Sequence, residues 1–185
     1  VSTAGNDTTG TGTSLLPYLT IQKAINDIPG IVCGRYIIHL MVAGTYVGAS
    51  RLDGRIFAGG GTFADDAIGY PIVNTTPTPN AYSWVEIRGN TTNASTYIIQ
   101  DHASDTVSGY PITVAGGNLT IKGVTIRLGS FGVHATKGAF VNLAAVKFEN
   151  NSVGVMGTES SVIHIDNNVT VDDLGLASVL IINNN

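Results

Sequence analysis

The chain has 185 residues, a net charge of -4 at pH 7 and only 12% charged residues. This length supports one domain with a sizeable core. The sparse, net negative charge disfavours nucleic acid or an anionic membrane surface as a partner. No stretch approaches the ~18 consecutive apolar residues of a membrane span, so no membrane insertion is expected.

The first predicted element is a helix over Tyr18–Ile28. Its apolar residues follow helical spacing, and Thr20 is a suitable N-terminal cap. On this spacing Leu19, Ile25 and Ile28 should face inward.

The next predicted element is a strand region over Ile37–Val47. Residues 51–79 then show no clean apolar period and are rich in Gly and Pro. A structureless stretch of this length is usually functional or mobile. It contains candidate ligand-contacting residues, namely Phe63, Asp65, Asp66 and Tyr70.

The segment Val85–Gly89 matches Leu119–Gly123, 34 positions later. Strands are predicted around Tyr97 and Ile99 and around Ile112 and Val114, which leaves residues 90–96 and 101–110 as enlarged corners. The second corner brings together Asp101, His102, Asp105 and Tyr110.

Residues 118–171 show the strongest pattern, because their apolar residues recur every 22 positions. Leu119 recurs as Val141 and Ile163, and the series that start at Ile121, Val124, Ile126, Phe131 and Val133 behave in the same way, with Val169 and Val171 one residue late. Within each unit the apolar residues alternate with polar ones, which is the strand period. Small residues or Asn at Gly123, Ala145 and Asn167 suit corners with left-handed backbone.

A period of ~20 to 30 residues indicates a small unit that buries its apolar face only by stacking on copies of itself. Three short strands per unit describe a coil of a parallel β-helix. The pattern therefore predicts an all-β chain whose coils of about 22 residues stack on one another.

This pattern resembles that of the pectate-lyase-like right-handed parallel β-helix superfamily, from about Ile37 to the last residue. Residues 1–7, 12–13, 17–18 and 20–25, and Gly44-Thr45-Tyr46, resemble the N-terminal part of many β-helix proteins of phage tails and secreted polysaccharide-active enzymes. The resemblance implies a right-handed parallel β-helix with an N-terminal capping helix over its first coil. We expect one domain, 1–185, with the capping segment at 1–30 and the coils at 31–185, as part of a larger chain or assembly.

Sugar-cleaving β-helices use two or three carboxylates, or a base with basic residues and often Ca²⁺. The candidate catalytic residues are Asp101, Asp105, Asp65 and Asp66. The candidate glycan-binding residues are Tyr70, His102, Tyr110 and Phe63, since aromatic rings offer flat apolar faces to sugars. The alternative interpretation is that these Asp and His residues only form turns or solvated loops.

The sequence predicts no metal site and no cofactor, and Ca²⁺ enters only under a lyase mechanism. Neither the lyase Asp cluster with paired Arg nor the polygalacturonase Asn-Thr-Asp motif is recognisable. On the outer face, Arg127 and Glu149 should form a surface ion pair, and His164 should lie above Asn142.

Three functional hypotheses remain. The preferred one is a structural or receptor-binding β-helix module of a bacteriophage tail or virion appendage that contacts bacterial surface polysaccharide. The second is a polysaccharide depolymerase, either a lyase or a glycoside hydrolase, that is secreted or carried on the virion. The third is a capsid-decorating fibre without a ligand. The resemblance implies a homotrimer or a larger virion assembly, with an extracellular location if the protein is a secreted enzyme.

Overall fold

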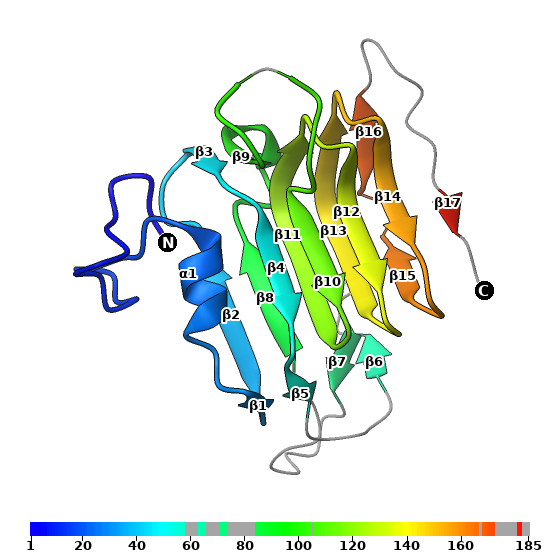
Figure 1. Cartoon of the computed structure of the whole chain (residues 1–185), viewed down its shortest axis with the longest axis horizontal. Coiled ribbons are helices and arrows are strands. Elements are labelled where there is room, and N and C mark those ends of the chain that lie inside the picture. Colours follow the sequence, from blue (N-terminus) through cyan, green and yellow to red (C-terminus); the bar gives the residue numbers. More distant parts are fainter. Residues whose placement is uncertain are drawn as a thin grey trace.

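The computed structural model consists mainly of β-strands that pair in parallel within curled sheets (Figure 1). The structure describes residues 1–57, 84–104, 106–166 and 168–171, and the backbone alone of 63–65, 71–73, 172 and 181–182. Within these ranges all strand pairs are parallel except one, β6 with β7.

The strands form three parallel ladders. The first ladder runs through β2 (Arg35–His39), β8 (Trp84–Arg88), the first half of β11 (Asn118–Arg127), the first half of β13 (Phe140–Glu149) and β15 (Val162–Ile165). The second runs through β3 (Gly44–Val47), β9 (Tyr97–Gln100), the second halves of β11 and β13, and β16 (Thr170–Asp172). The third runs through β4 (Ser50–Asp53), β10 (Ile112–Ala115), β12 (Phe131–Thr136), β14 (Val153–Gly157) and β17 (Ile181–Ile182).

Short elements complete the described part of the chain. They are α1 (Ile21–Asn26), the 3₁₀ turn η1 (Ala94–Thr96), the paired strands β1 (Ile31–Val32) and β5 (Ile56–Phe57), and the antiparallel pair β6 (Phe63–Asp65) and β7 (Pro71–Val73).

The predicted pairing of residues 22 positions apart is confirmed. Leu119 pairs with Val141, and Val141 pairs with Ile163. The late repeat is confirmed as well, because Phe148 pairs with Val171. The predicted interval of 34 also holds, since Val85 pairs with Leu119.

The corner positions adopt the expected backbone. Gly123 has φ 65° and Ala145 has φ 50°, both in the left-handed region that allows the chain to turn between the two halves of β11 and β13. The third predicted corner residue, Asn167, lies outside the described residues.

The alternating apolar residues of all three ladders meet in one core. Ile87, Ile121 and Leu143 from successive strands of the first ladder are each fully buried. Burying such a side chain contributes about 1.5–3 kcal/mol, so the paired strands hold each other in register. The outer face of the sheets is thereby left to carry polar and partly exposed side chains.

The predicted helix forms but is shorter than expected. Thr20 caps it, accepting a bond from the N–H of Lys23 at 3.1 Å. The carboxylate of Asp7 accepts the N–H groups of Leu19 and Thr20, which keeps Tyr18 and Leu19 out of the helix. Leu19 is therefore 43% exposed, and the expectation that it faces inward is wrong, whereas Ile25 and Ile28 are buried as predicted.

The predicted strand region Ile37–Val47 is two strands in the structure, β2 and β3. Leu40 between them is fully buried, and its N–H donates to the carbonyl of Arg88. The chain therefore leaves one ladder and joins the next at this point, which makes it a corner.

Candidate functional site

The described residues 101–104 and 106–110 lie in the enlarged corner between β9 and β10, as predicted. Tyr110 is the last residue of this corner and is 45% exposed. Its ring stacks on that of Phe131, with a centroid distance of 5.4 Å and an interplanar angle of 13°. His134 lies against both rings, with centroid distances of 5.8 Å.

We call Tyr110, Phe131 and His134 the aromatic shelf. Phe131 was expected to follow Val133 into the core, but it is only partly buried and does not belong to the core cluster. The reason lies in the neighbouring strand β10, which begins only at Ile112 and pairs there with Val133. The residues before Ile112 belong to the corner and form no strand beside Phe131. Phe131 therefore packs on the side chain at the end of that corner.

His134 provides a polar group within the shelf. Burial, the largest effect, lowers the pKa of His134, while Glu159 opposes this and Arg51 adds to it. The imidazole is therefore neutral near pH 7 and can both donate and accept a hydrogen bond. The hydroxyl of Thr158 lies 3.4 Å from its Nε2 atom.

Asp101 holds the backbone of Tyr110, the shelf residue at the end of the corner. Its Oδ2 atom accepts the N–H of Tyr110 at 3.1 Å. Gly109 has φ +68°, and a Cβ atom there would lie 1.6 Å from this same carboxylate oxygen. Only glycine lets the backbone pass this close, so Gly109 and Asp101 together set the position of Tyr110.

His102 and Ser108 join this corner but do not form a catalytic relay. The Nδ1 atom of His102 lies 3.4 Å from Asp101 Oδ2 and also 3.4 Å from the Ser108 hydroxyl. A Ser-His-Asp relay needs the two partners on opposite ring nitrogens. Here they share one nitrogen, so the arrangement suits binding and turn formation better than nucleophilic catalysis.

A strip of outward side chains continues from the shelf across the third ladder. Thr113 of β10 pairs with His134 on one side and with Arg51 of β4 on the other, and His134 pairs with Met156 of β14. The Arg51 side chain is 54% exposed and is held by Asp53 at 2.8 Å. Thr113 itself is only 8% exposed, so the strip offers ring faces and a charged pair on either side of it.

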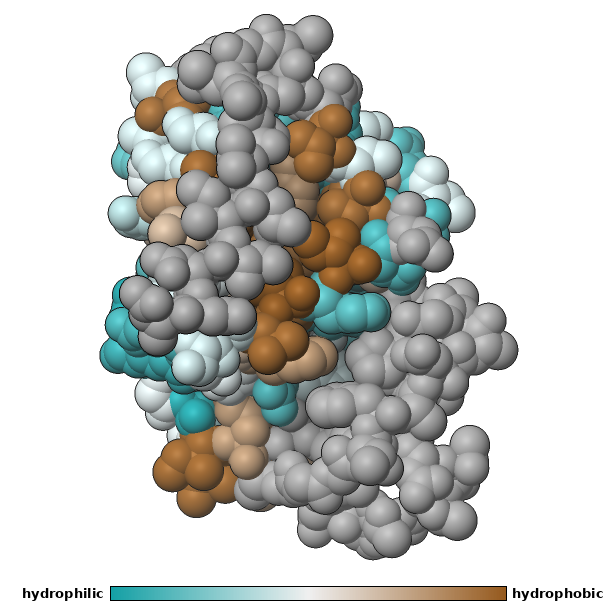
Figure 2. All heavy atoms as spheres, turned by 90° about the vertical axis from the view of Figure 1, so that its right-hand side faces the viewer, coloured by the Kyte–Doolittle hydropathy of each residue, from teal (hydrophilic) through white to brown (hydrophobic). Residues whose placement is uncertain are grey.

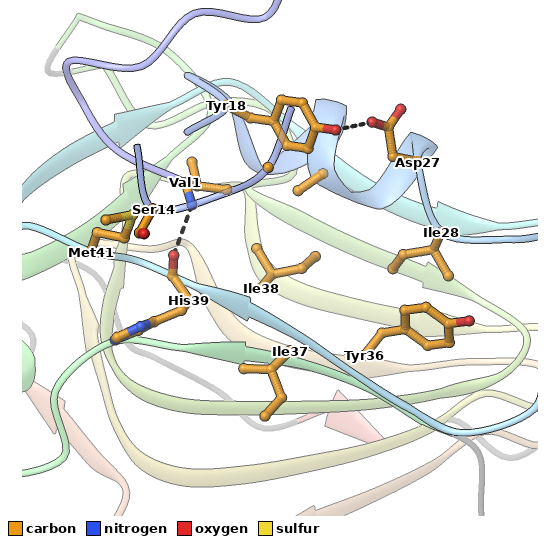
Figure 3. Close-up of a pocket in the computed structure, with 12 residues that line it drawn as sticks. Val1, Ser14, Tyr18, Asp27, Ile28, Tyr36, Ile37, Ile38, His39 and Met41 are labelled. Carbon is orange, nitrogen blue, oxygen red and sulfur yellow. Dashed lines mark hydrogen bonds between the residues drawn. The ribbon is translucent and has the colours of Figure 1, made fainter. Parts of the chain in front are cut away.

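Hollows lined by described residues also lie away from the shelf. A polar groove of about 500 Å³ crosses the corner positions of neighbouring coils and is lined by Thr91, Thr92, Ala94, Ala145, Val146, Lys147, Asp166, Asn168 and Thr170. A second hollow of about 380 Å³ lies between α1, the N-terminal segment and β2 (Figure 3). There the Tyr18 hydroxyl donates to Asp27, and Ile28, Tyr36 and Ile38 form an apolar wall. This second hollow belongs to the cap at the end of the ladders.

The predicted site residues are only partly placed. Asp101, His102 and Tyr110 come together in one corner, as the sequence indicated. Phe63 and Asp65 lie on β6, whose backbone alone is described, and Asp66, Tyr70 and Asp105 lie outside the described residues. Asp101 is thus the one candidate catalytic carboxylate whose side-chain surroundings are described.

Sequence reasoning missed Phe131 and His134 as partners of Tyr110. A signal was present, because Ile112 pairs with Val133, 21 positions later, and the same interval carries Tyr110 onto Phe131. The 22-residue period of the later coils concealed this shorter interval.

Within the described ranges, no group of three His, Cys, Asp or Glu side chains is arranged to hold a metal ion. No helix among the described residues is long and apolar enough to cross a membrane. Comparisons of the chain with protein-family models, with curated proteins and with solved structures find no match.

Proposed function

We propose that this chain is a right-handed parallel β-helix module that binds bacterial surface polysaccharide through the aromatic shelf. Three parallel ladders, a repeated interval of 22 residues and left-handed corner residues support the solenoid. Parts of residues 1–25 resemble the N-terminal segment of β-helix proteins of phage tails and of secreted polysaccharide-active enzymes, and we propose a place in a bacteriophage tail or virion appendage.

The stacked rings of Tyr110 and Phe131 carry the proposal. A sugar ring has an apolar face of C–H groups and a rim of hydroxyls. The flat shelf suits that face, while His134 and the exposed His102 supply donors and acceptors for the rim.

Binding is favoured over cleavage by the geometry of Asp101. This carboxylate is 14% exposed and already accepts the N–H of Tyr110, so it acts as a support for the shelf. Glycoside hydrolysis uses a pair of carboxylates roughly 5 to 9.5 Å apart. A supporting role for Asp101 removes one candidate from such a pair. The competing function is a depolymerase, and the experiment must distinguish binding of the polysaccharide from its cleavage.

The test is Tyr110→Ala in a binding assay against a panel of purified bacterial surface polysaccharides. Loss of an aromatic anchor should weaken binding about tenfold, since such anchors contribute on the order of 1–2 kcal/mol. Ile56→Ala, at a 65% exposed apolar side chain of β5, is the matched control and should bind like the wild type.

Two outcomes contradict the proposal. If Tyr110→Ala binds as tightly as the wild type, the shelf is not the contact. If the wild-type protein releases reducing ends from the bound polysaccharide and Asp101→Ala abolishes this release, the module is a depolymerase.

A further inference from the structure

A buried carboxylate on the outer face of the first ladder gathers three cations. Glu86 of β8 is 2% exposed although it points away from the apolar core. Its Oε2 atom accepts from Arg35 at 2.6 Å, and its Oε1 atom accepts from Arg88 at 2.6 Å and lies 2.9 Å from Lys122. The cations come from three adjacent strands, β2, β8 and β11.

This cluster is positively charged overall. One carboxylate and three cations leave a local net charge of +2. The whole chain has only nine Lys and Arg residues and a net charge of -4, so a third of its basic residues lie at this one place. Burial raises the pKa of Glu86, but the hydrogen bonds from Arg88, Lys122 and Arg35 outweigh burial and lower that pKa to about 2.

The two arginines are fixed but not enclosed. The side chains of Arg35 and Arg88 remain 41% and 31% exposed. Glu86 accepts from Nε and Nη2 of Arg35 and from Nε of Arg88, and part of each arginine side chain still reaches the surface. The Arg35 guanidinium also lies over the ring of Trp84, 5.4 Å from its centroid.

We propose that Arg35 and Arg88 form a binding site for an oxyanion, which is a carboxylate, sulfate or phosphate group. A guanidinium presents two parallel N–H groups that match two oxygens of such an anion. Because Glu86 holds both guanidinium groups in place, little side-chain entropy is lost on binding. His39 of β2 pairs with Arg88 of β8. His39 and Lys122 extend the polar surface around the anion.

The site is independent of the aromatic shelf, since it lies on the first ladder whereas the shelf lies on the third. It therefore does not depend on the proposed polysaccharide binding. An anion carried by a saccharide and a free inorganic anion share the chemistry that the two arginines recognise.

Trp84 is the one tryptophan of the chain, and it reports directly on Arg35. The experiment titrates the protein with sodium glucuronate, sulfate and phosphate at constant ionic strength, and follows tryptophan fluorescence. Glucose serves as the neutral control and sodium chloride as the ionic one. We expect a saturable change with at least one oxyanion and none with glucose or chloride.

Variants separate the site from general charge effects. Arg88→Gln should weaken anion binding by about tenfold or more, because charge-assisted hydrogen bonds are the strong ones. Arg88→Lys keeps the charge but loses the fork, so it should also weaken binding and gives a second result if Arg88→Gln folds poorly. Lys137→Gln removes an exposed cation that belongs to neither proposed site and should leave the titration unchanged.

The outcomes are decisive in each case. Saturation by glucuronate alone assigns the site to a carboxylate on a saccharide, and saturation by sulfate or phosphate alone assigns it to a tetrahedral anion. No saturable change with any of the three, or equal losses in Arg88→Gln and Lys137→Gln, overturns the proposal.

Discussion

At the scale of single residues, Glu86 shows how a polar side chain can be buried on the outside of a sheet. A buried carboxylate is costly unless it is paired and hydrogen-bonded. Four hydrogen bonds or ion pairs from three strands satisfy it, so its charge joins β2, β8 and β11 across the ladder. The same residue thus stabilises the first coils and orients the two arginines of the proposed anion site.

This pairing predicts a specific pH dependence. The pKa of Glu86 falls from 4.5 to about 2 on folding, so its contribution to stability is complete above pH ~4.5 and is lost as the pH falls through about 2. The difference corresponds to on the order of 3 kcal/mol. Glu86→Gln should be less stable than the wild type at pH 6, and this deficit should shrink toward pH 2.

Denaturant unfolding of both proteins between pH 2 and pH 6 measures this deficit. Glu149→Gln, at a carboxylate that is 32% exposed, is the control and should show little change at any pH. A deficit in Glu86→Gln that stays constant across the pH range would show that the carboxylate does not stabilise the fold through its charge.

At the scale of elements, the corners decide how each strand passes into the next ladder. Gly123 and Ala145 occupy the same place in successive coils, and both have positive φ. Their surroundings differ, however. A Cβ atom at Gly123 would lie 2.5 Å from the carbonyl carbon of Asn90, because the enlarged corner of the preceding coil closes over it.

The two corner positions predict opposite effects on stability when glycine and alanine are exchanged. Gly123→Ala should destabilise the protein by about 2 kcal/mol or more, because the added methyl group collides with backbone. Ala145→Gly should be neutral or stabilising by about 0.5 kcal/mol, since the strain of a left-handed alanine slightly exceeds the entropy cost of glycine. Thermal unfolding of the two variants provides the comparison, and equal destabilisation by both would contradict this account of the corners.

At the scale of the whole molecule, the end of the ladders at β15 and β16 carries apolar side chains on its surface. Val162, Ile165 and Val171 are 54%, 39% and 55% exposed. Figure 2 views the molecule from this end and shows apolar groups gathered across its middle. Among the described residues β15 and β16 each pair only with β13, and unpaired strand edges beside apolar surface favour association with another chain.

We therefore expect the protein to form a homotrimer or a larger assembly. Light scattering at micromolar concentration should give at least three times the mass of one chain. Val171→Lys should shift this mass toward the monomer, because it places a charge in the apolar surface, whereas Ile56→Lys near the other end should not. A wild-type protein that is monomeric under these conditions would refute the prediction.

The sequence alone determined the pairing of the strands in the later coils. Side chains in stacked coils must match in size and polarity, so the period of 22 residues also appears in the pairing of Leu119 with Val141 and of Val141 with Ile163. The left-handed backbone at Gly123 was predictable as well, because glycine tolerates it, and the interval of 22 residues carried this prediction to Ala145. The corner at residues 101–110 could be located for a related reason, since it is an insertion into a regular interval.

Only the tertiary structure decided which outward side chains meet. Arg127 and Glu149 do lie side by side, but Arg127 donates instead to Gln100 at 2.8 Å, so the predicted ion pair is wrong. His164 does contact Asn142, at 2.7 Å. Phe131 lies outside the core and stacks on Tyr110. Glu86 pairs with cations that are far apart in the sequence, from Arg35 to Lys122. Core pairing in the later strands follows a strict period because each added strand repeats the same contacts, whereas outward contacts depend on corner lengths and side-chain directions that differ along the ladders.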